Sequence, residues 1–128
     1  MRLLIDTHVL IWWVQEPKKI RKTIRDDISN DENEVFVSAV SAWEIANKVR
    51  IGKLRFAQDI LDSFEESIRL LNFEHLPVSA KHAVAGAKIE APHKDPFDRM
   101  LAGQALVEGM KLISADPQFK QLGVETVW

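Results

Sequence analysis

Four acidic residues spread along the chain are the best candidates for chemistry: Asp6, Glu44, Asp98 and Asp116. Carboxylates that lie close together repel one another, so some of them stay protonated or a cation sits among them. The chain has no cysteine, which excludes thiolate ligands, disulfides and a cysteine nucleophile. An all-oxygen site without sulfur or paired histidines suits Mg²⁺ or Mn²⁺ and disfavours zinc. The acids therefore predict a site for a hard divalent ion, provided that the fold brings them together.

Short apolar runs alternate with segments of helical periodicity along the 128 residues. The runs predict strands at 3–5, 35–37, 73–78, 112–113 and 124–128, and the periodic segments predict helices at 8–15, 17–28, 41–50, 57–71, 79–89 and 96–107, with a helical turn at 117–122. Uniformly apolar strands that alternate with helices favour a parallel sheet covered on both faces. We expect one α/β domain over residues 1–128, because this length is close to the commonest domain size.

The predicted elements bring the four acids towards one edge of that sheet. Asp6 and Asp116 follow predicted strands, while Glu44 and Asp98 stand in the first turns of predicted helices. Parallel α/β sheets bind their ligands beyond the carboxyl ends of the strands. The order of elements therefore predicts that all four carboxylates meet there.

Each acid also fits an ordinary structural role at the start of a helix. Ser41 and Glu44 have the spacing of a capping box. Asp95 precedes Pro96, as an N-cap residue often precedes a proline in the first turn. The same cap patterns occur at Asp6-Thr7 and Asp116-Pro117. Helix starts lie at the carboxyl edge of a parallel sheet in any case, so only a wider pattern separates a binding site from a set of caps.

That wider pattern consists of four segments in a fixed order. They are Leu4-Ile5-Asp6-Thr7, Ser38-Ala39-Val40-Ser41-Ala42-Trp43-Glu44-Ile45, His93-Lys94-Asp95-Pro96-Phe97-Asp98-Arg99-Met100-Leu101-Ala102 and Leu112-Ile113-Ser114-Ala115-Asp116. In these segments the chain closely resembles the PIN domain and, within it, the VapC-type toxins of bacterial toxin–antitoxin pairs. The resemblance covers almost the whole sequence and places the acids of the family on Asp6, Glu44, Asp98 and Asp116.

The resemblance implies a Rossmann-like fold with about five parallel strands. It also implies a metal-dependent endoribonuclease that cleaves RNA phosphodiester bonds with Mg²⁺ or Mn²⁺. The partners that it implies are a VapB-like antitoxin and a second copy in a homodimer, and the absence of cysteine fits a cytoplasmic protein. The alternative is a PIN fold kept as a binding or assembly module without activity, although the presence of all four acids argues against it.

The four acids receive distinct roles under this interpretation. We expect Asp6 and Asp98 to bind the metal directly, and Asp116 to bind it directly or through water. Glu44 either binds the metal or accepts a proton from the attacking water. Metal ions in such sites lower the pKa of bound water and stabilise charge on the leaving oxygen.

Residues beside the acids are candidates for supporting roles. Asp95 is mainly an N-cap, Ser114 bonds a carboxylate or a substrate oxygen, and Thr7 stands next to Asp6. The candidate RNA contacts are Lys48, Arg99 and His93. Lys48 alternatively forms a helix-surface ion pair with Glu44, four residues earlier. Arg99 alternatively pairs with Asp95.

The remaining candidates have mostly structural explanations. His8, His75 and His82 are expected to be packing or surface residues, and Trp12 and Trp13 to lie in the core or an interface. Ile20, Ile24 and Ile28 recur every fourth residue and share a helix face, which indicates core packing. Part of this face, with Trp12 or Trp13, is the expected place for a groove that takes an antitoxin helix.

Bulk properties limit the other classes of function. The net charge of −2 argues against tight non-specific binding of nucleic acid by the general surface. The longest apolar run, residues 9–14, is far shorter than the ~20 residues of a membrane span. Asp6-Thr7-His8 lacks the acidic pair of a phospho-acceptor receiver and the Asp-x-Asp motif of a phosphatase.

Overall fold

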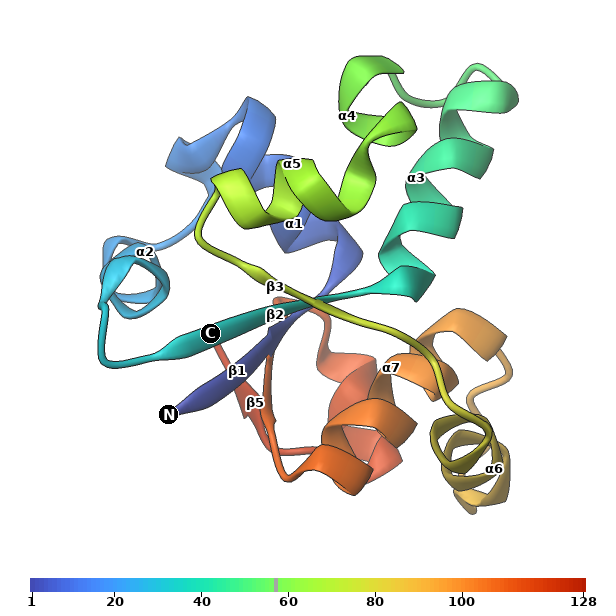
Figure 1. Ribbon diagram of the computed structural model, residues 1–128. Coiled ribbons are helices and arrows are strands. Elements are labelled where there is room, and N and C mark those ends of the chain that lie inside the picture. Colours follow the sequence, from blue (N-terminus) through green and yellow to red (C-terminus); the bar gives the residue numbers. More distant parts are fainter. Residues whose placement is uncertain (57) are drawn as a thin grey trace.

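A five-stranded parallel sheet forms the centre of the computed structural model, which describes residues 1–56 and 58–128. The strands are β1 (Arg2–Ile5), β2 (Glu34–Ser38), β3 (Glu74–Leu76), β4 (Lys111–Ile113) and β5 (Thr126–Val127). Their order is β3-β2-β1-β4-β5, and every neighbouring pair is parallel (Figure 1). The expected sheet is confirmed.

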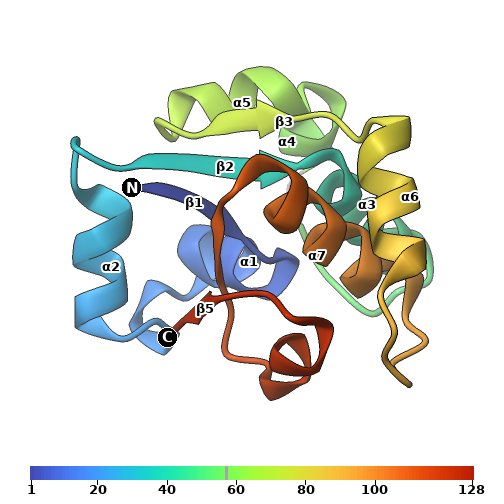
Figure 2. The same ribbon diagram turned by 90° about the horizontal axis from the view of Figure 1, so that it is seen from below.

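Helices cover both faces of the sheet, as Figure 1 shows, and Figure 2 views the molecule from below, on the side of α7. They are α1 (Thr7–Gln15), η1 (Pro17–Lys19), α2 (Lys22–Ser29), α3 (Ala39–Arg50), α4 (Gln58–Asp62), α5 (Phe64–Leu70), α6 (Ala80–Lys88), α7 (Pro96–Glu108) and η2 (Pro117–Leu122). Helices α1, α2 and α5 lie over one face, and α7 and η2 lie over the other, where α6 packs on α7. No helix in the described part of the chain is long and apolar enough to cross a membrane.

The core is divided in two by the alternation of side chains along the strands. On β1, Leu3 and Ile5 belong to the cluster under α1 and α2, whereas Leu4 belongs to the cluster under α7 and η2. Successive side chains of a strand point to opposite faces, so a strand buried on both faces must be apolar throughout. This explains the uninterrupted apolar runs that indicated a parallel sheet.

Three predicted helices differ from the observed ones. The helix expected from residue 17 is interrupted, because Ile20 is extended with a ψ of 131° between η1 and α2. The helix expected over 57–71 is divided at Ser63 into α4 and α5, and residue 57 lies outside the described residues. Helix α3 begins at Ala39, two residues earlier than expected. Ile20, Ile24 and Ile28 are nevertheless all buried in one cluster, as their spacing predicted.

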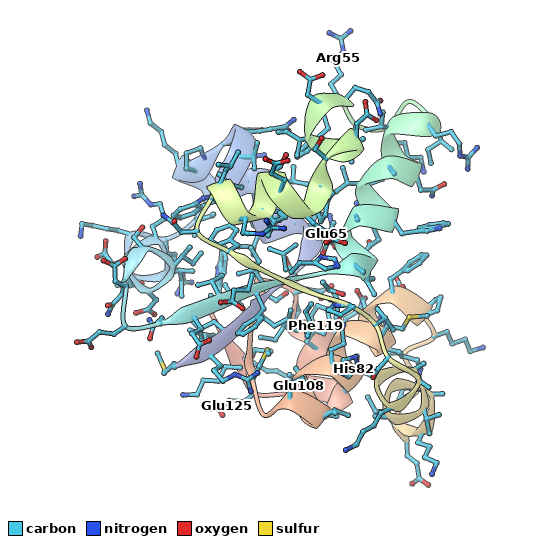
Figure 3. The ribbon with its side chains drawn as sticks, viewed as in Figure 1. Arg55, Glu65, His82, Glu108, Phe119 and Glu125 are labelled. Carbon is cyan, nitrogen blue, oxygen red and sulfur yellow. The ribbon has the colours of Figure 1, made fainter. Side chains whose placement is uncertain are left out.

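Helices α6 and α7 pack against each other at unusually short range. A Cβ atom at Gly103 would collide with backbone atoms of His82 and Gly86 on α6, so only glycine fits there. The ring of His82 is 3% exposed and contacts the Glu108 carboxylate of α7 at 2.9 Å (Figure 3). Its other ring nitrogen accepts a hydrogen bond from the backbone N–H of Ser79, the N-cap of α6. The expected packing role of His82 is confirmed, and the pair α6–α7 forms a rigid support for the start of α7.

Candidate active site

A cavity of about 230 Å³ lies at the carboxyl edge of the sheet, between β1, β4, α3 and α7. The residues around it are Asp6, Thr7, His8, Glu44, Lys48, Asp95, Asp98, Leu101, Asp116 and Phe119. All four acids singled out in the sequence are among them. The cavity therefore brings together carboxylates that are separated by up to 110 residues along the chain.

Asp6 is the most deeply buried of these acids, with 5% of its surface exposed. It follows β1 and caps α1, because its Oδ1 accepts a hydrogen bond of 2.8 Å from the backbone N–H of Val9. The hydroxyl of Ser114, directly after β4, donates to the other carboxylate oxygen. Ser114 thus bonds a carboxylate, one of its two expected roles, and both Asp6 oxygens are held in place.

Glu44 is positioned by a tertiary contact and takes no part in the cap of its own helix. The N-cap of α3 is Ser38, whose hydroxyl accepts from the backbone N–H of Val40 at 3.0 Å. The capping box expected from Ser41 and Glu44 is therefore wrong. Thr7 Oγ1 donates to Glu44 Oε1 at 2.8 Å and contacts the buried Ser41 hydroxyl at 2.9 Å. Ser41 and Thr7 link α1 to α3 and direct Glu44 into the cavity.

Asp98 and Asp95 stand three residues apart at the start of α7 and play different parts. Asp95 Oδ1 accepts from the backbone N–H groups of Phe97 at 2.9 Å and Asp98 at 3.4 Å. Asp95 is therefore the N-cap of α7, as expected, and it also lines the cavity. Asp98 Oδ2 lies 2.7 Å from His93 Nε2. The His93 ring orients the carboxylate, and its Nε2 faces Asp98.

Asp116 completes the set from the opposite side of the cavity. It caps η2 by accepting from the backbone N–H of Gln118 at 2.9 Å, and its own N–H donates to Ser114 Oγ at 3.0 Å. Ser114 consequently bridges the backbone of Asp116 and the carboxylate of Asp6. The segment after β4 holds the two acids in a fixed relation.

Burial and mutual repulsion favour the protonated forms of three of these acids. Loss of hydration raises the pKa of Asp6, Glu44 and Asp98 above their ordinary values. Hydrogen bonds from Ser114, Thr7 and His93 respectively oppose the rise. The negative charge of Asp98 raises the pKa of both Asp6 and Glu44 further. A cation inside the cavity would reverse this balance, since it favours the charged forms.

The donor chemistry of the cavity fits a hard divalent ion. Its acidic side chains supply carboxylate oxygens, the ligands that Mg²⁺ and Mn²⁺ take. Among the described residues, no three His, Asp or Glu side chains are arranged as a ready ligand group. The carboxylates are instead turned to protein donors such as Ser114, Thr7 and His93. The residues therefore fit a divalent ion in type and location. To bind the ion, the carboxylates would give up hydrogen bonds to these protein donors.

Lys48 and His8 lie at the rim of the cavity, and the sequence alone did not predict their contact with each other. Lys48 lines the cavity, and its Nζ lies 3.5 Å from His8 Nε2. Within the described residues it makes no ion pair with Glu44 closer than 4.0 Å, although its charge lowers the Glu44 pKa. The expected helix-surface ion pair is therefore wrong. His8 is exposed, as expected of a surface residue, and it also lines the cavity. Its place two residues after Asp6, at the start of α1, was the available signal for this second location.

Arg99 points away from the cavity and holds the backbone around it. Its guanidinium donates to the carbonyl oxygens of His93 at 2.9 Å, Gly86 at 3.2 Å, Ile89 at 2.9 Å and Ala91 at 2.9 Å. These four bonds tie the loop before α7 to the end of α6. Among the described residues Arg99 makes no ion pair with Asp95, so that expected alternative is wrong, while the expected RNA contact stays a prediction.

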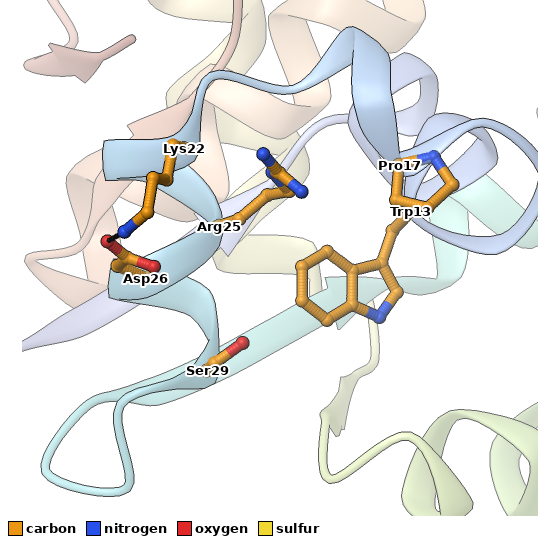
Figure 4. Close-up of a pocket in the computed structure, with 6 residues that line it drawn as sticks. All are labelled: Trp13, Pro17, Lys22, Arg25, Asp26 and Ser29. Carbon is orange, nitrogen blue, oxygen red and sulfur yellow. Dashed lines mark hydrogen bonds and ion pairs between the residues drawn. The ribbon is translucent and has the colours of Figure 1, made fainter.

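A second hollow, of about 550 Å³, lies away from the acids between α1 and α2. Trp13, Pro17, Lys22, Arg25, Asp26 and Ser29 line it (Figure 4). The indole of Trp13 forms its apolar wall, and its ring also packs on Phe73 at 5.9 Å between centroids. The isoleucines of the predicted groove are absent from its lining because all three are buried in the core. Of that predicted groove, Trp13 alone contributes to the observed hollow.

The chain is similar to known proteins in both sequence and fold. It is 25% identical over 122 residues to Ribonuclease VapC22 from Mycobacterium tuberculosis, covering 92% of this chain and 89% of that protein. The solved structure of VapBC2 from Rickettsia felis, bound to a DNA fragment from their promoter, matches 99% of this chain and 98% of its own with a TM-score of 0.73 and 16% identity. The structure of FitAB bound to the IR36 DNA fragment matches 98% of this chain and 93% of its own with a TM-score of 0.70 and 20% identity.

The family model described as PIN domain matches residues 3–125. These residues contain β2, β3 and β4, β1 apart from its first residue, and all four acids of the cavity, while β5 follows directly after them. The sheet order, the cavity at its carboxyl edge and this match agree, and the chain belongs to the PIN domain family.

Proposed function

We propose that this chain is a metal-dependent endoribonuclease that acts as the toxin of a toxin–antitoxin pair. The observation that carries the proposal is the convergence of four carboxylates, from four separate elements, on one cavity in which burial raises the pKa of three of them. Helix capping explains Asp6 and Asp116 one at a time, but it does not require four carboxylates around one cavity, an arrangement that suits a site whose charge a cation neutralises. The relation to Ribonuclease VapC22 supports RNA as the substrate.

Each side chain of the site has a distinct task under this proposal. Asp6 and Asp98 would hold Mg²⁺ or Mn²⁺ directly, Asp116 directly or through water, and Glu44 either as a ligand or as the proton acceptor. The ion, when bound, would make water a better nucleophile and offset charge on the leaving oxygen. Ser114 fixes the orientation of Asp6, and Thr7 fixes that of Glu44. Asp95 anchors the start of α7, and His93 orients Asp98 from the loop before it.

The rim and the second hollow supply surfaces for partners. Lys48 stands at the mouth of the cavity with no carboxylate within 4.0 Å in the described part of the chain, and a phosphate of the RNA would meet it there. The hollow beside Trp13 has one aromatic wall and the charged side chains of Lys22, Arg25 and Asp26. An amphipathic helix of a VapB-like antitoxin suits such a surface. The VapBC structures from Rickettsia felis and from nontypeable Haemophilus influenzae support a partner of the VapB type. A homodimer remains the expectation that follows from the family resemblance.

A cleavage assay tests the proposal directly. Purified chain is incubated with a mixed-sequence RNA in Mg²⁺, in Mn²⁺ and in EDTA, beside the variants Asp6→Asn and Asp98→Asn. We expect cleavage by the unaltered chain with either ion, none in EDTA, and a loss of about a hundredfold to a thousandfold in each variant, the range for loss of one charge-stabilising group. Circular dichroism confirms that the variants fold. Full activity in either folded variant would refute the assignment of the site.

One observation favours the alternative, a PIN fold that binds without catalysis. In residues 1–56 and 58–128 the acidic side chains are not yet gathered into a group that could hold an ion. The same assay separates the two functions, because a binding module cleaves RNA under none of these conditions. Titration of the chain with Mn²⁺ then shows whether the cavity takes an ion at all.

A further inference from the structure

Two stacked aromatic rings follow the acid site on α3 and α7, and neither of them lines the acid cavity. The Trp43 and Phe97 rings lie 4.8 Å apart between centroids with 27° between their planes. Phe97 is half-buried against the core, but Trp43 is 55% exposed, although burial of a tryptophan is strongly favourable. One face of the Trp43 indole is covered by Phe97, and much of the residue remains in contact with water.

The ring pair is joined to the acids through the chain itself. Trp43 directly precedes Glu44 on α3, and Phe97 directly precedes Asp98 on α7. Consecutive residues of a helix are about 100° apart around its axis, so Trp43 and Phe97 stand next to the acids on α3 and α7 without lining the cavity themselves. A polymer that has one unit in the cavity would therefore bring the neighbouring unit to the rings.

A cation follows the ring pair along the same face of α3. Trp43, Ala46, Asn47 and Arg50 line a hollow of about 230 Å³, and their spacing places them on one face of the helix. Ala46 leaves space above the helix, while Arg50 donates to Asn47 Oδ1 at 2.7 Å and closes the far end with its positive charge. The hollow thus has an aromatic wall at the end near the acids and a guanidinium at the other.

This arrangement suits single-stranded nucleic acid better than a packed protein surface. Unpaired bases stack on aromatic side chains, and nearby cations hold the phosphates between them. A stable protein interface needs about 800 Å² on each partner with an apolar centre. In this hollow the only exposed large apolar side chain among the described residues is Trp43, and the other walls are small or polar.

We propose that Trp43, supported by Phe97, stacks on an unpaired base of the RNA next to the cleaved bond, and that Arg50 binds the phosphate beyond that base. The proposal rests on the endoribonuclease function proposed above and restricts its substrate to RNA that is single-stranded at the site. Duplex RNA keeps its bases inside the helix and offers no free base face to Trp43.

The test compares Trp43→Ala with Trp43→Phe, which keeps a flat ring, and with Leu106→Ala, a matched control at another exposed apolar residue on α7. Steady-state cleavage of one oligonucleotide, single-stranded or paired with its complement, gives kcat and KM separately. We expect Trp43→Ala to raise KM for the single strand about tenfold, within the range for loss of one base stack, with little change in kcat. Trp43→Phe should restore most of the affinity, and Leu106→Ala should leave both constants unchanged.

A scan of abasic sites along the same oligonucleotide identifies the stacked base. With the unaltered chain, one abasic position next to the cleaved bond should weaken binding of the oligonucleotide. In Trp43→Ala, the same abasic site should cause no further loss of affinity, because the stacking partner is already absent. An unchanged KM in Trp43→Ala, or equal cleavage of duplex and single strand, would overturn the stacking proposal. A change of oligomeric state in Trp43→Ala, measured by light scattering, would overturn it in favour of a protein interface. An unaltered chain that cleaves no RNA would refute the endoribonuclease function itself.

Discussion

Removal of the Arg99 guanidinium should destabilise the fold and leave the binding of RNA phosphates unaffected. The four hydrogen bonds of this group end on backbone carbonyls of residues that do not line the cavity. Of these residues, only His93 contacts a cavity acid with its side chain, at Asp98. A hydrogen bond from a charged donor contributes ~1.5–3 kcal/mol. The contributions of the four hydrogen bonds are not additive. The partly buried carbonyls also bind water again when the donor is lost, which lowers the total. We therefore expect Arg99→Met to lower the free energy of unfolding by about 3 kcal/mol, or roughly 12 °C in Tm for a chain of this size.

The matched variant Arg99→Lys keeps the positive charge and loses the geometry. A lysine ammonium reaches fewer of the four carbonyls than the planar guanidinium, so Arg99→Lys should recover about a third of the lost stability. Urea denaturation in EDTA measures the stability, and fluorescence polarisation of labelled RNA below the melting temperature measures binding. The reasoning is refuted if Arg99→Met keeps the Tm of the unaltered chain while its affinity for RNA falls. That result would return Arg99 to the RNA-binding surface.

Three further predictions concern packing, pH and metal. Gly103→Ala should cost about 1–3 kcal/mol, because its Cβ would meet the backbone of α6, and thermal melts beside the exposed control Leu106→Ala would show it. In EDTA, the free energy of unfolding should fall as pH rises from the ordinary carboxyl range through the raised pKa values of Asp6, Glu44 and Asp98. The reason is that the folded state binds protons at these carboxyls more tightly than the unfolded state does. Denaturation measured at several pH values would contradict the burial argument if stability rose over this range. Mg²⁺ should raise Tm with the logarithm of its concentration, and Asp98→Asn should abolish the rise, which a Tm series measures directly.

The sheet and most helix ends were predictable because local signals determine them. The apolar runs of β1, β2 and β4 are buried on both faces and tolerate no polar residue in between. Asp95 and Asp116 cap their helices as the following prolines indicated. Gly109 ends α7 with a positive φ of 65°, a conformation that glycine adopts without strain. In each case the physical cause lies within a few residues of the position predicted.

The wrong predictions share a different cause, which is a partner from a distant part of the chain. Ser41 has the sequence environment of a cap, but Thr7 of α1 binds its hydroxyl, and Ser38 takes the cap. Apolar periodicity predicts which residues are buried, but it does not show whether the helix is continuous. Ile20 is therefore buried as predicted, although the backbone is extended at this residue. Arg99 was paired with Asp95 in one alternative because no sequence signal indicates that four carbonyls would surround its guanidinium.

The capping roles and the proposed catalytic roles of the acids support each other. Asp6 uses one oxygen for the N–H of Val9 and the other for Ser114, so the cap itself fixes the carboxylate at the cavity. The partial positive charge at the start of α1 also offsets part of the cost of burying it. Asparagine caps helices about as well as aspartate, so Asp6→Asn removes the negative charge and keeps the cap, whereas Asp6→Ala removes both. A loss of cleavage in Asp6→Asn without a loss of stability would therefore assign the charge to catalysis and the geometry to the fold.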